Sequence, residues 1–383
     1  MTHDRAAVFY ISGHGFGHAA RQIEVLNTLH SVAPGLRLIV RTAAPRWIFD
    51  LTLTAPVDWQ ELECDTGVVQ VDSLSVDVER TVRGAKAFYD SLHARAAAEA
   101  EWLRARAPVL VVGDIPPLAF AAAHLAGMRS VAIGNFTWDW IYEGYAETSA
   151  LAPDLLRTIR EAYSHAELAL RLPLHGGFAP FRTVRDVPFI ARRSRRRPQE
   201  VRAHFGLPHS PLVLASFGGY GLKGLDFAAL ADLAGYTVVV TADPTAMRRG
   251  RDVENTGAAP DLPASVRLVD ERHLYDEGYR YEDLVAAVDI VATKPGYSII
   301  AECAANDAAV LYTSRGRFIE YETLVRDMPR YVRSEFISNE DLIGGRWQRA
   351  LDRLMAKPKP PPPDVTGAEV VAGVISSYAA RRG

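Results

Sequence analysis

The sequence has few cysteines and no long apolar run. Only two of its 383 residues are cysteines, Cys64 and Cys303, and no CxxC pair occurs, so we expect neither a disulfide framework nor a structural zinc site. The longest apolar stretch, residues 109–127, is interrupted by Asp114 and two prolines, which argues against a membrane-spanning helix. The first apolar run, residues 6–11, is too short for a signal peptide. We therefore expect a cytoplasmic protein without an integral membrane segment.

The chain also lacks a large excess of charge of either sign. Its 43 lysines and arginines nearly balance 46 acidic residues, so the formal net charge is −3 and no general attraction to nucleic acid is expected. A basic run comprises Arg192, Arg193, Arg195, Arg196 and Arg197. We interpret this run as a solvated linker rather than as a membrane or nucleic-acid site, with phosphate binding as a further alternative.

Two common nucleotide-binding signatures are missing. In "GHGFGH", residues 13–18, glycine occurs at every second position, unlike the GxGxxG dinucleotide fingerprint. The strand expected next ends at Arg41 and Thr42, without the acidic residue that holds the ribose of NAD, although an arginine there suits NADP. No P-loop sequence of the form GxxxxGKS or GxxxxGKT occurs. A nicotinamide enzyme and a P-loop ATPase or GTPase are therefore poor interpretations, and we expect no required cofactor.

The chain does contain a regular alternation of apolar, β-branched runs and helical patterns. This alternation predicts parallel sheets covered by helices on both faces. In the first half we expect strands at 8–12, 36–41, 109–113 and 130–134, with helices at 21–31, 85–106 and 117–126. In the second half we expect strands at 212–217, 237–242, 265–269, 289–293 and 308–312, with helices that follow Asp226, Ser298 and Glu320.

A break in this alternation divides the chain. Residues 180–205 are rich in arginine and proline and have no period, so we interpret them as an interdomain connection. We therefore expect two Rossmann-like, doubly wound α/β domains, 1–190 and 191–383, with an interdomain cleft at the carboxyl ends of the strands. After the stiff "KPKPPPPDV" spacer, a last helix at about 367–378 is free to pack back on the N-terminal domain.

The turn after the first strand carries two histidines, His14 and His18. His18 lies where a helix begins, and the positive end of a helix keeps an imidazole neutral and able to accept a proton. Asp114 ends another strand and is expected to face the same cleft, where it orients this imidazole. The alternatives are a capping or polar contact for His18 and a helix N-cap for Asp114. The role of His14 is open between these two possibilities.

Two turns in the second half suit a phosphate. The loop with Gly218, Gly219 and Gly221 allows backbone amides to approach an anion. The turn with Lys294, Gly296 and Ser298 leads into a helix whose first amides can bind phosphate. Glu302 lies one turn further on the same face as Ser298, where a carboxylate accepts hydrogen bonds from ribose hydroxyls. In the alternative interpretation Ser298 is a cap and Glu302 is a solvated surface residue.

The first domain is expected to bind the acceptor, that is, a second substrate that receives a transferred group. Aromatic faces suit sugar rings and other planar groups, although packing between helices is the alternative for at least one tryptophan. The candidates are Asn135, Trp138, Asp139 and Trp140 in "NFTWDWIYEGY", and Asp65 in "CDTGVVQ".

These residues resemble those of a known class. "GHAARQIEVLNTL" and "DIVATKPGYSIIAECAA" are similar to the first turn and the donor segment of GT-B glycosyltransferases, which use nucleotide sugars. The resemblance implies that His18 is the catalytic base, that Asp114 pairs with it and that Glu302 holds the ribose. In "GRFIEYETL" it makes Glu320 and Glu322 candidates for the hydroxyls of the donor sugar.

A longer resemblance covers most of the chain. "YISGHGFGHAARQIEVL", "ELECDTGVVQVDSLSVD" and "GNFTWDWIYEGY" resemble the glycosyltransferase-like amino-terminal region of plant L-arabinokinases. The kinase domain of that family, with its phosphate loop, has no counterpart here, so sugar phosphorylation is not implied.

The motifs together predict an inverting, metal-independent glycosyltransferase. Retaining members of the class often carry a second glutamate eight positions after the first, but position 310 is valine. We expect a UDP- or dTDP-sugar as donor and a small molecule or glycan as acceptor, with the diphosphate held by amides and a lysine instead of a metal ion. The alternatives are a nucleotide-sugar sensing protein without turnover and an epimerase of the same fold. The sequence does not indicate an oligomeric state.

Overall fold

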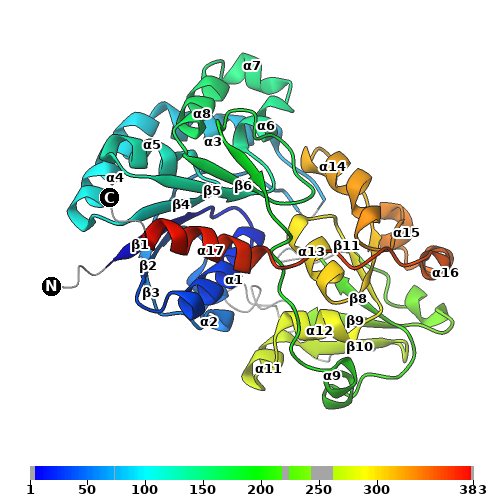
Figure 1. The fold of residues 1–383 in the computed structure, drawn as a ribbon. Helices are drawn as coiled ribbons and strands as arrows, with labels where there is room; N and C mark the ends of the chain where they lie inside the picture. Colours follow the sequence, from blue (N-terminus) through cyan, green and yellow to red (C-terminus); the bar gives the residue numbers. More distant parts are fainter. Residues whose placement is uncertain (1–4, 73, 218–223, 243–261, 381–383) are drawn as a thin grey trace, which may run out of the picture. The chain divides into compact units, whose positions relative to one another are not determined.

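The computed structural model describes residues 5–72, 74–217, 224–242 and 262–380. The chain divides into two compact units (Figure 1). Unit 1 contains Met1–Gln70, Val76–Ala191 and Asp364–Gly383, and unit 2 contains Val71–Ser75 and Arg192–Pro363. The sequence suggested an acceptor-side domain at 1–190 and a nucleotide-sugar-binding domain at 191–383, and these two functional assignments stay a prediction.

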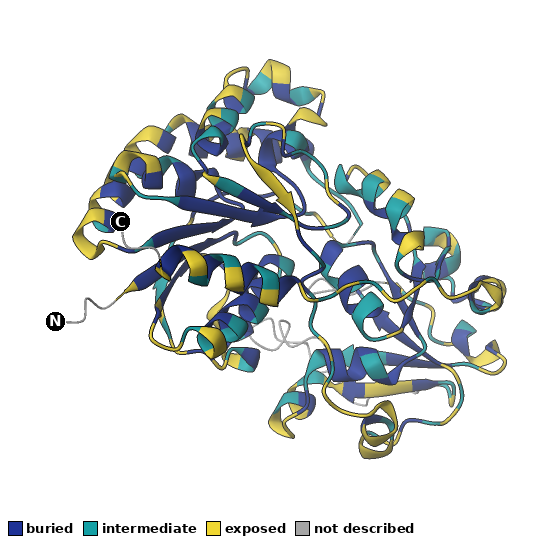
Figure 2. Cartoon of the chain, viewed as in Figure 1, coloured by how far each residue is buried: buried dark blue, intermediate teal, exposed yellow. Residues whose placement is uncertain are grey.

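Unit 1 is built on a parallel sheet of seven strands in the order β3-β2-β1-β4-β5-β6-β7. The central strands are buried along their whole length, because helices cover a parallel sheet on both faces (Figure 2). The strands are β1 Ala6–Ile11, β2 Arg37–Thr42, β3 Val57–Glu61, β4 Leu110–Asp114, β5 Ser130–Gly134, β6 Leu168–Arg171 and β7 Val184–Asp186. The expected doubly wound sheet is therefore present in the first half of the chain.

Helices connect these strands, and their ends follow ordinary capping chemistry. Helix α5 begins at Pro117, whose missing N–H costs nothing in a first turn, and ends before Gly127, which adopts a φ of 72°. The helices of unit 1 are α1 Gly17–Val32, α2 Arg46–Thr52, α3 Val78–Asp90, α4 Leu92–Arg106, α5 Pro117–Ala126, α6 Trp138–Glu143, α7 Glu147–Leu151, α8 Leu155–Ser164 and α17 Gly367–Ala380.

The last helix, α17, belongs to unit 1 although it follows all of unit 2 in the sequence. It lies beside α1 (Figure 1). Arg5 Nη1 donates a hydrogen bond to the carbonyl of Ala379 at 2.8 Å, and the Tyr378 hydroxyl donates to Glu167 Oε1 at 3.1 Å. These contacts attach the C-terminal helix to the residue before β1 and to the residue before β6.

Unit 2 contains a parallel sheet of six strands in the order β10-β9-β8-β11-β12-β13. Its core includes fully buried Trp347, whose Nε1 donates to the carbonyl of Leu342 at 2.7 Å. The strands are β8 Leu212–Ser216, β9 Thr237–Ala242, β10 Val266–Asp270, β11 Ile290–Thr293, β12 Ala309–Tyr312 and β13 Ser334–Phe336. The helices are α9 Pro198–His204, η2 Ala229–Asp232, α11 Glu271–Asp276, α12 Tyr281–Ala287, α13 Tyr297–Ala305, α14 Glu320–Asp327, η3 Met328–Arg330, α15 Asn339–Ile343 and α16 Gln348–Ala356.

The structure corrects three local expectations. The single helix expected at 85–106 is two helices, α3 and α4, which meet at Ser91. The helix expected after Asp226 is only the short 3₁₀ turn η2, which ends before Gly235 with its φ of 77°. The connection expected at 180–205 contains strand β7 and helix α9. Strand β7 is exposed at all three positions, so it lacks the apolar pattern by which a strand is recognised in a sequence.

Candidate functional site

The carboxyl ends of β1 and β4 lie side by side and position the first cluster of polar residues. Ile11 at the end of β1 is in register with Asp114 at the end of β4, and Ser12 N donates to the Asp114 carbonyl at 2.9 Å. The chain then turns through residues 13–16 into α1, so that His18 stands in the first turn of that helix. Parallel topology therefore brings two residues together that are 96 positions apart.

The carboxylate of Asp114 is the centre of this cluster. His18 Nδ1 lies 2.8 Å from Asp114 Oδ1, and Arg21 Nη2 donates to the same oxygen. The other oxygen, Oδ2, accepts from Arg21 Nε at 2.6 Å and from Gln22 Nε2 at 2.7 Å. Burial by itself raises the pKa of Asp114, but the charges and hydrogen bonds of Arg21 and His18 outweigh it and lower that pKa to about 2. Asp114 is therefore ionised near neutral pH.

An ionised Asp114 determines which nitrogen of His18 carries the proton. A carboxylate only accepts hydrogen bonds, so the contact at 2.8 Å requires a proton on His18 Nδ1. Arg21 Nη2 also lies 2.8 Å from Nδ1, but neither group accepts in this state, and both donate to Asp114 instead. The neutral imidazole consequently keeps its lone pair on Nε2, as proton abstraction requires.

The imidazole of His18 is more enclosed than we expected for a residue facing an open cleft. The residue is only 5% exposed, and its ring meets the edge of Phe136 with centroids 5.5 Å apart. Nε2 forms no hydrogen bond with any residue that the structure describes.

Arg21 and Gln22 are the residues that sequence reasoning missed. They lie three and four positions after His18, hence on the same face of α1, and this spacing was the available signal. Arg21 is 4% exposed, and its Nη1 donates to Asn135 Oδ1 at 2.8 Å. Asn135, which we expected to contact an acceptor, is thus a buried partner of the guanidinium.

The other acceptor candidates are also largely buried. Trp138 is 1% exposed, and its Nε1 donates to Asp65 Oδ2 at 2.9 Å. Asp139 is 3% exposed and accepts from Arg160 Nε at 3.0 Å. Trp140 is half-buried and packs so closely on Gly176 that a Cβ at that glycine would lie 2.4 Å from the indole. Trp138 therefore lies in the core, as the packing alternative predicted.

His14 lies in the turn between β1 and α1, and the roles of its two ring nitrogens are the reverse of those in His18. Its Nδ1 accepts from the Val68 N–H at 3.2 Å, so a neutral His14 carries its proton on Nε2. Its ring meets the edge of Trp138 with centroids 5.5 Å apart. This packing requires a glycine at position 67. A Cβ atom added there would lie 2.4 Å from His14 Nδ1, and the backbone has a φ of 68°, which other residues rarely adopt. His14 and His18 are thus not interchangeable.

The second cluster lies in unit 2, at the end of β11. Gly296 is the N-cap of α13, and Ser298 lies in the first turn of that helix. Burial, and then repulsion by Arg315, lower the pKa of Lys294 to about 7, although Asp72 opposes the shift. Two cationic side chains beside a helix N-terminus form an environment that favours an anion. Gly218, Gly219 and Gly221 lie outside the described residues.

Glu302 is buried in an ion pair, which the sequence did not indicate. It is 3% exposed, and its Oε1 accepts from Arg192 Nε at 2.7 Å and from Nη2 at 2.6 Å. Burial raises the pKa of Glu302, and the Arg192 charge opposes this rise. Arg192 therefore does not belong to a solvated linker, and Glu302 is not the solvated residue of the alternative interpretation. The remaining arginines of the basic run, at 193 and 195–197, are exposed.

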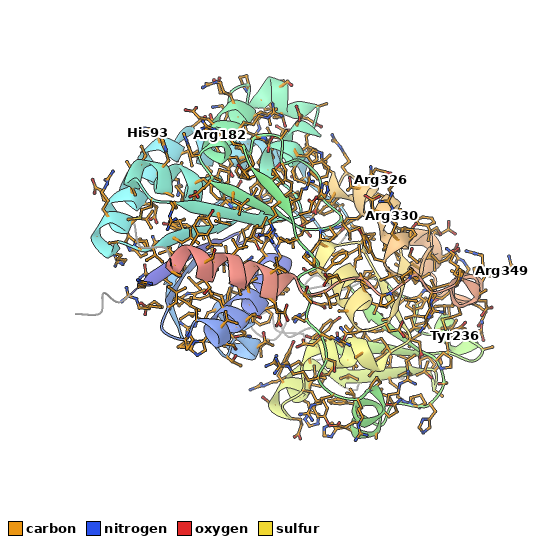
Figure 3. All side chains as sticks on the ribbon, in the orientation of Figure 1. His93, Arg182, Tyr236, Arg326, Arg330 and Arg349 are labelled. Carbon is orange, nitrogen blue, oxygen red and sulfur yellow. The ribbon has the colours of Figure 1, made fainter. Side chains whose placement is uncertain are left out.

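The two glutamates expected to bind the donor sugar both lie in the first turn of α14. Glu320 is half-buried and Glu322 is exposed. Arg326 in the last turn of α14 and Arg330 in the following η3 lie at the surface (Figure 3), where both pair with Asp327.

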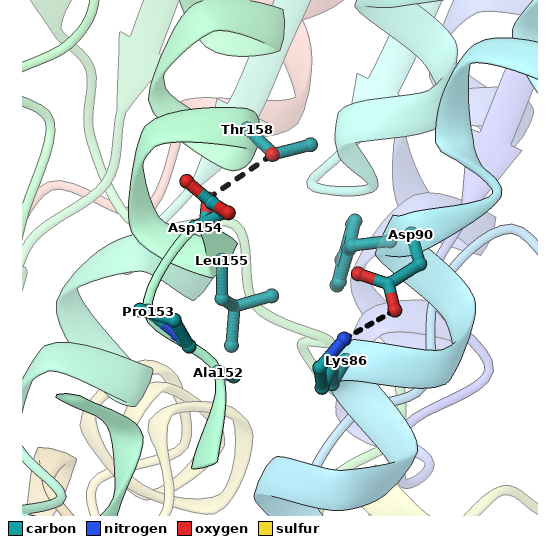
Figure 4. A pocket seen from close by; sticks show the side chains of 8 residues that line it. Lys86, Asp90, Ala152, Pro153, Asp154, Leu155 and Thr158 are labelled. Atoms are coloured by element: carbon teal, nitrogen blue, oxygen red, sulfur yellow. Dashed lines mark hydrogen bonds and ion pairs between the residues drawn. The ribbon is translucent and has the colours of Figure 1, made fainter. Parts of the chain in front are cut away.

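A surface pocket in unit 1 contains none of the candidate residues. It is lined by Lys86, Tyr89 and Asp90 of α3 and by 152–155 and Thr158 at α8 (Figure 4). Lys86 Nζ pairs with Asp90 Oδ2 at 2.5 Å on its rim.

Among the described residues, no group of three or more His, Cys, Asp and Glu side chains is placed to hold a metal ion. In the same part of the chain, every helix is too short or too polar to cross a bilayer.

One curated protein resembles this chain along nearly its whole length, whereas no protein-family model matches it. The L-arabinokinase of Arabidopsis thaliana is 31% identical over 382 residues, which are 98% of this chain and 34% of that protein. The chain thus spans about a third of the length of this relative. The matching part is the N-terminal region, without the kinase domain, as the sequence motifs predicted.

Solved structures of glycosyltransferases share the fold. The calicheamicin glycosyltransferase CalG4 superposes with a TM-score of 0.56 at 14% identity, covering 98% of this chain and 99% of that one. VinC, solved in complex with dTDP, gives 0.53 at 15% identity and covers 98% and 95%. UGT2 of Phytolacca americana, complexed with UDP-2-fluoro-glucose and pterostilbene, gives 0.58 at 12% identity and covers 98% and 94%. At these identities the likeness shows the fold alone, which is GT-B, as predicted.

Proposed function

We propose that the chain is a glycosyltransferase that moves a sugar from a nucleotide diphosphate sugar to an acceptor hydroxyl with inversion at the anomeric carbon. The observation that carries this proposal is the contact of 2.8 Å between His18 Nδ1 and Asp114 Oδ1. Because Asp114 is ionised, this contact leaves Nε2 of His18 as the proton acceptor. The nucleotide sugar bound to UGT2 and the dTDP bound to VinC support the class of donor.

In the proposed reaction His18 acts as general base. The acceptor O–H bond breaks and its proton passes to Nε2, while the oxygen forms a bond to the anomeric carbon. The bond between that carbon and the diphosphate breaks on the opposite face, so the configuration inverts. The nucleoside diphosphate leaves with the negative charge, and the proton stays on the imidazole until the products depart.

Residues of unit 2 stabilise the leaving diphosphate. The amides at the start of α13, near Gly296 and Ser298, and the side chains of Lys294 and Arg315 supply positive charge for it. These groups take the part that a divalent metal takes in other transferases. Lys294 is protonated in the bound state, since a diphosphate anion raises its pKa from the value of about 7.

Glu302 is the proposed contact of the ribose, and only one of its two carboxylate oxygens is available for that contact. Arg192 occupies Oε1 with two N–H groups, so only Oε2 accepts from a ribose hydroxyl. Burial raises the pKa of Glu302, and the charge of Arg192 opposes that rise. Glu320 and Glu322, in the first turn of α14, remain the proposed contacts of the donor sugar.

The test combines turnover with binding. Nucleotide release is measured from a panel of UDP-, dTDP- and GDP-sugars with simple acceptors, and nucleotide affinity is measured by titration calorimetry. His18→Ala is expected to lose about 10²–10⁴-fold in turnover while keeping its nucleotide affinity. Glu302→Gln is expected to lose affinity for the nucleotide. His93→Ala is the control, since this histidine is exposed on α4 (Figure 3).

Either of two results contradicts the proposal. One is full turnover in His18→Ala, because no other group with a free acceptor nitrogen is proposed for the base. The other is the absence of a raised melting temperature with every nucleotide in the panel, because any ligand that binds the native state stabilises it by mass action.

A further inference from the structure

The two oxygens of the Glu302 carboxyl group have unequal partners. Oε1 accepts a hydrogen bond from Arg192 Nε at 2.7 Å and forms an ion pair with Arg192 Nη2 at 2.6 Å. A carboxyl oxygen has two lone pairs, so the two donors of this one guanidinium occupy Oε1. Oε2 accepts no hydrogen bond from any residue that the structure describes. The capacity of this buried carboxyl group to bind a ligand therefore lies on a single oxygen.

Arg192 is held in this position through its backbone as well as its side chain. Its carbonyl accepts from Asn306 Nδ2 at 3.0 Å, and Asn306 Oδ1 accepts from the Ser194 N–H at 2.9 Å. Its Nη1 lies 3.7 Å from Oε2 of Glu282, a second buried glutamate on α12. A movement of the guanidinium would take its charge away from two buried acidic side chains, which is unfavourable. We therefore expect the pair of Arg192 and Glu302 to persist when a ligand binds.

A ribose presents two neighbouring hydroxyl groups, on C2′ and C3′. A carboxyl group with both oxygens free accepts one hydrogen bond from each hydroxyl, but at Glu302 only Oε2 remains. We propose that the nucleotide site recognises one of the two ribose hydroxyls and disregards the other, and that Arg192 sets this specificity. The site consequently accepts nucleoside diphosphates that lack one ribose hydroxyl. The assignment rests on the proposed function, in which Glu302 contacts the ribose.

The two hydroxyls are expected to differ in their effect on affinity. Removing the hydroxyl that donates to Oε2 leaves a buried acceptor without its donor, which costs about 10–100-fold in affinity. Removing the other hydroxyl takes no donor from Glu302, so the affinity is expected to change by less than about threefold. A carboxyl group with two free oxygens would instead lose affinity in both cases.

The experiment measures how tightly the full chain binds UDP, 2′-deoxy-UDP and 3′-deoxy-UDP by titration calorimetry, and then the same three forms of GDP. With the base that binds, we expect one deoxy form to stay within about threefold of the ribonucleotide and the other to bind about 10–100-fold more weakly. A similar loss with both deoxy forms overturns the inference, because it indicates two ribose contacts. No loss with either form also overturns it, because Glu302 then contacts neither hydroxyl.

These outcomes separate the inference from the proposed function. If a ribonucleotide binds and its two deoxy forms behave alike, the inference fails and the proposed function is unaffected. If no nucleoside diphosphate binds, the proposed function fails and the inference fails with it. The comparison uses the wild-type protein, so it does not depend on the folding of a variant.

Two lysine substitutions connect the specificity to Arg192. Arg192→Lys keeps the charge but replaces the planar fork of N–H groups with a single ammonium, so Oε1 is less completely occupied. Both deoxy forms are then expected to bind more weakly than the ribonucleotide, each by at least about threefold. Arg193→Lys is the matched control, because this neighbouring arginine is exposed, and it should keep the wild-type preference. A wild-type preference in folded Arg192→Lys would show that Arg192 does not set the specificity.

Discussion

Replacing Arg21 with methionine tests the buried cluster around Asp114 at a residue that the sequence did not indicate. The substitution keeps most of the apolar stem but removes the donors to both oxygens of Asp114 and to Asn135 Oδ1. Asp114 then keeps only His18 Nδ1 and Gln22 Nε2 as donors, and its charge is no longer balanced. At neutral pH the buried carboxylate of Asp114 then lacks its cationic partner.

The magnitude follows from the burial of both partners. Arg21 and Asp114 are 4% and 1% exposed, so the change leaves a buried charge without its partner, at a cost of about 3–5 kcal/mol in the free energy of unfolding. In a domain of roughly 150–250 residues, 1 kcal/mol lowers Tm by about 2–4 °C. The thermal transition of unit 1 is therefore expected to fall by about 6–20 °C.

Differential scanning calorimetry measures this shift, and two further variants interpret it. Arg83→Met removes an exposed guanidinium that lies 2.8 Å from Glu79, and it is expected to cost less than about 1 kcal/mol. Adding Asp114→Asn to Arg21→Met is expected to recover part of the loss, because the unpaired charge is then gone. A loss in Arg21→Met no larger than that in Arg83→Met would refute the reasoning.

Three shorter predictions concern other parts of the two clusters. Gly67→Ala is expected to lower Tm, because its Cβ would lie 2.4 Å from His14 Nδ1 at a φ of 68°, whereas Gly84→Ala on α3 meets nothing within 4 Å and should not. Since the pKa of Lys294 is about 7, nucleotide binding at pH 8 is expected to take up a proton, which calorimetry in two buffers of different ionisation enthalpy measures; an equal heat in both contradicts it. The low pKa of Asp114 contributes about 2 kcal/mol of stability that is present above pH 3.8 and is lost as the pH falls to about 2, so the urea midpoint of Asp114→Asn should lack this decline.

Local patterns were sufficient to predict much of the fold. Strands such as β1 and β4 are continuous apolar runs because both of their faces are buried, and such runs are recognisable from composition alone. Strands β3, β6, β7 and β13 were missed. Strands β3, β7 and β13 lie at sheet edges, where exposed positions take polar residues, whereas β6 lies inside its sheet and is only four residues long. No sequence pattern indicated that residues 71–75 belong to unit 2.

The candidate site shows the same division between local and non-local information. The sequence by itself determined that His18 stands at a strand-to-helix turn and that Asp114 ends a strand, because turns and strand ends depend on neighbours in the chain. Only the tertiary structure decided which charges are paired, since Arg21 meets Asp114 across 93 positions and Arg192 meets Glu302 across 110. Burial makes these partners decisive, because a charge removed from water is stable only beside a group that compensates it, and that group can come from anywhere in the chain.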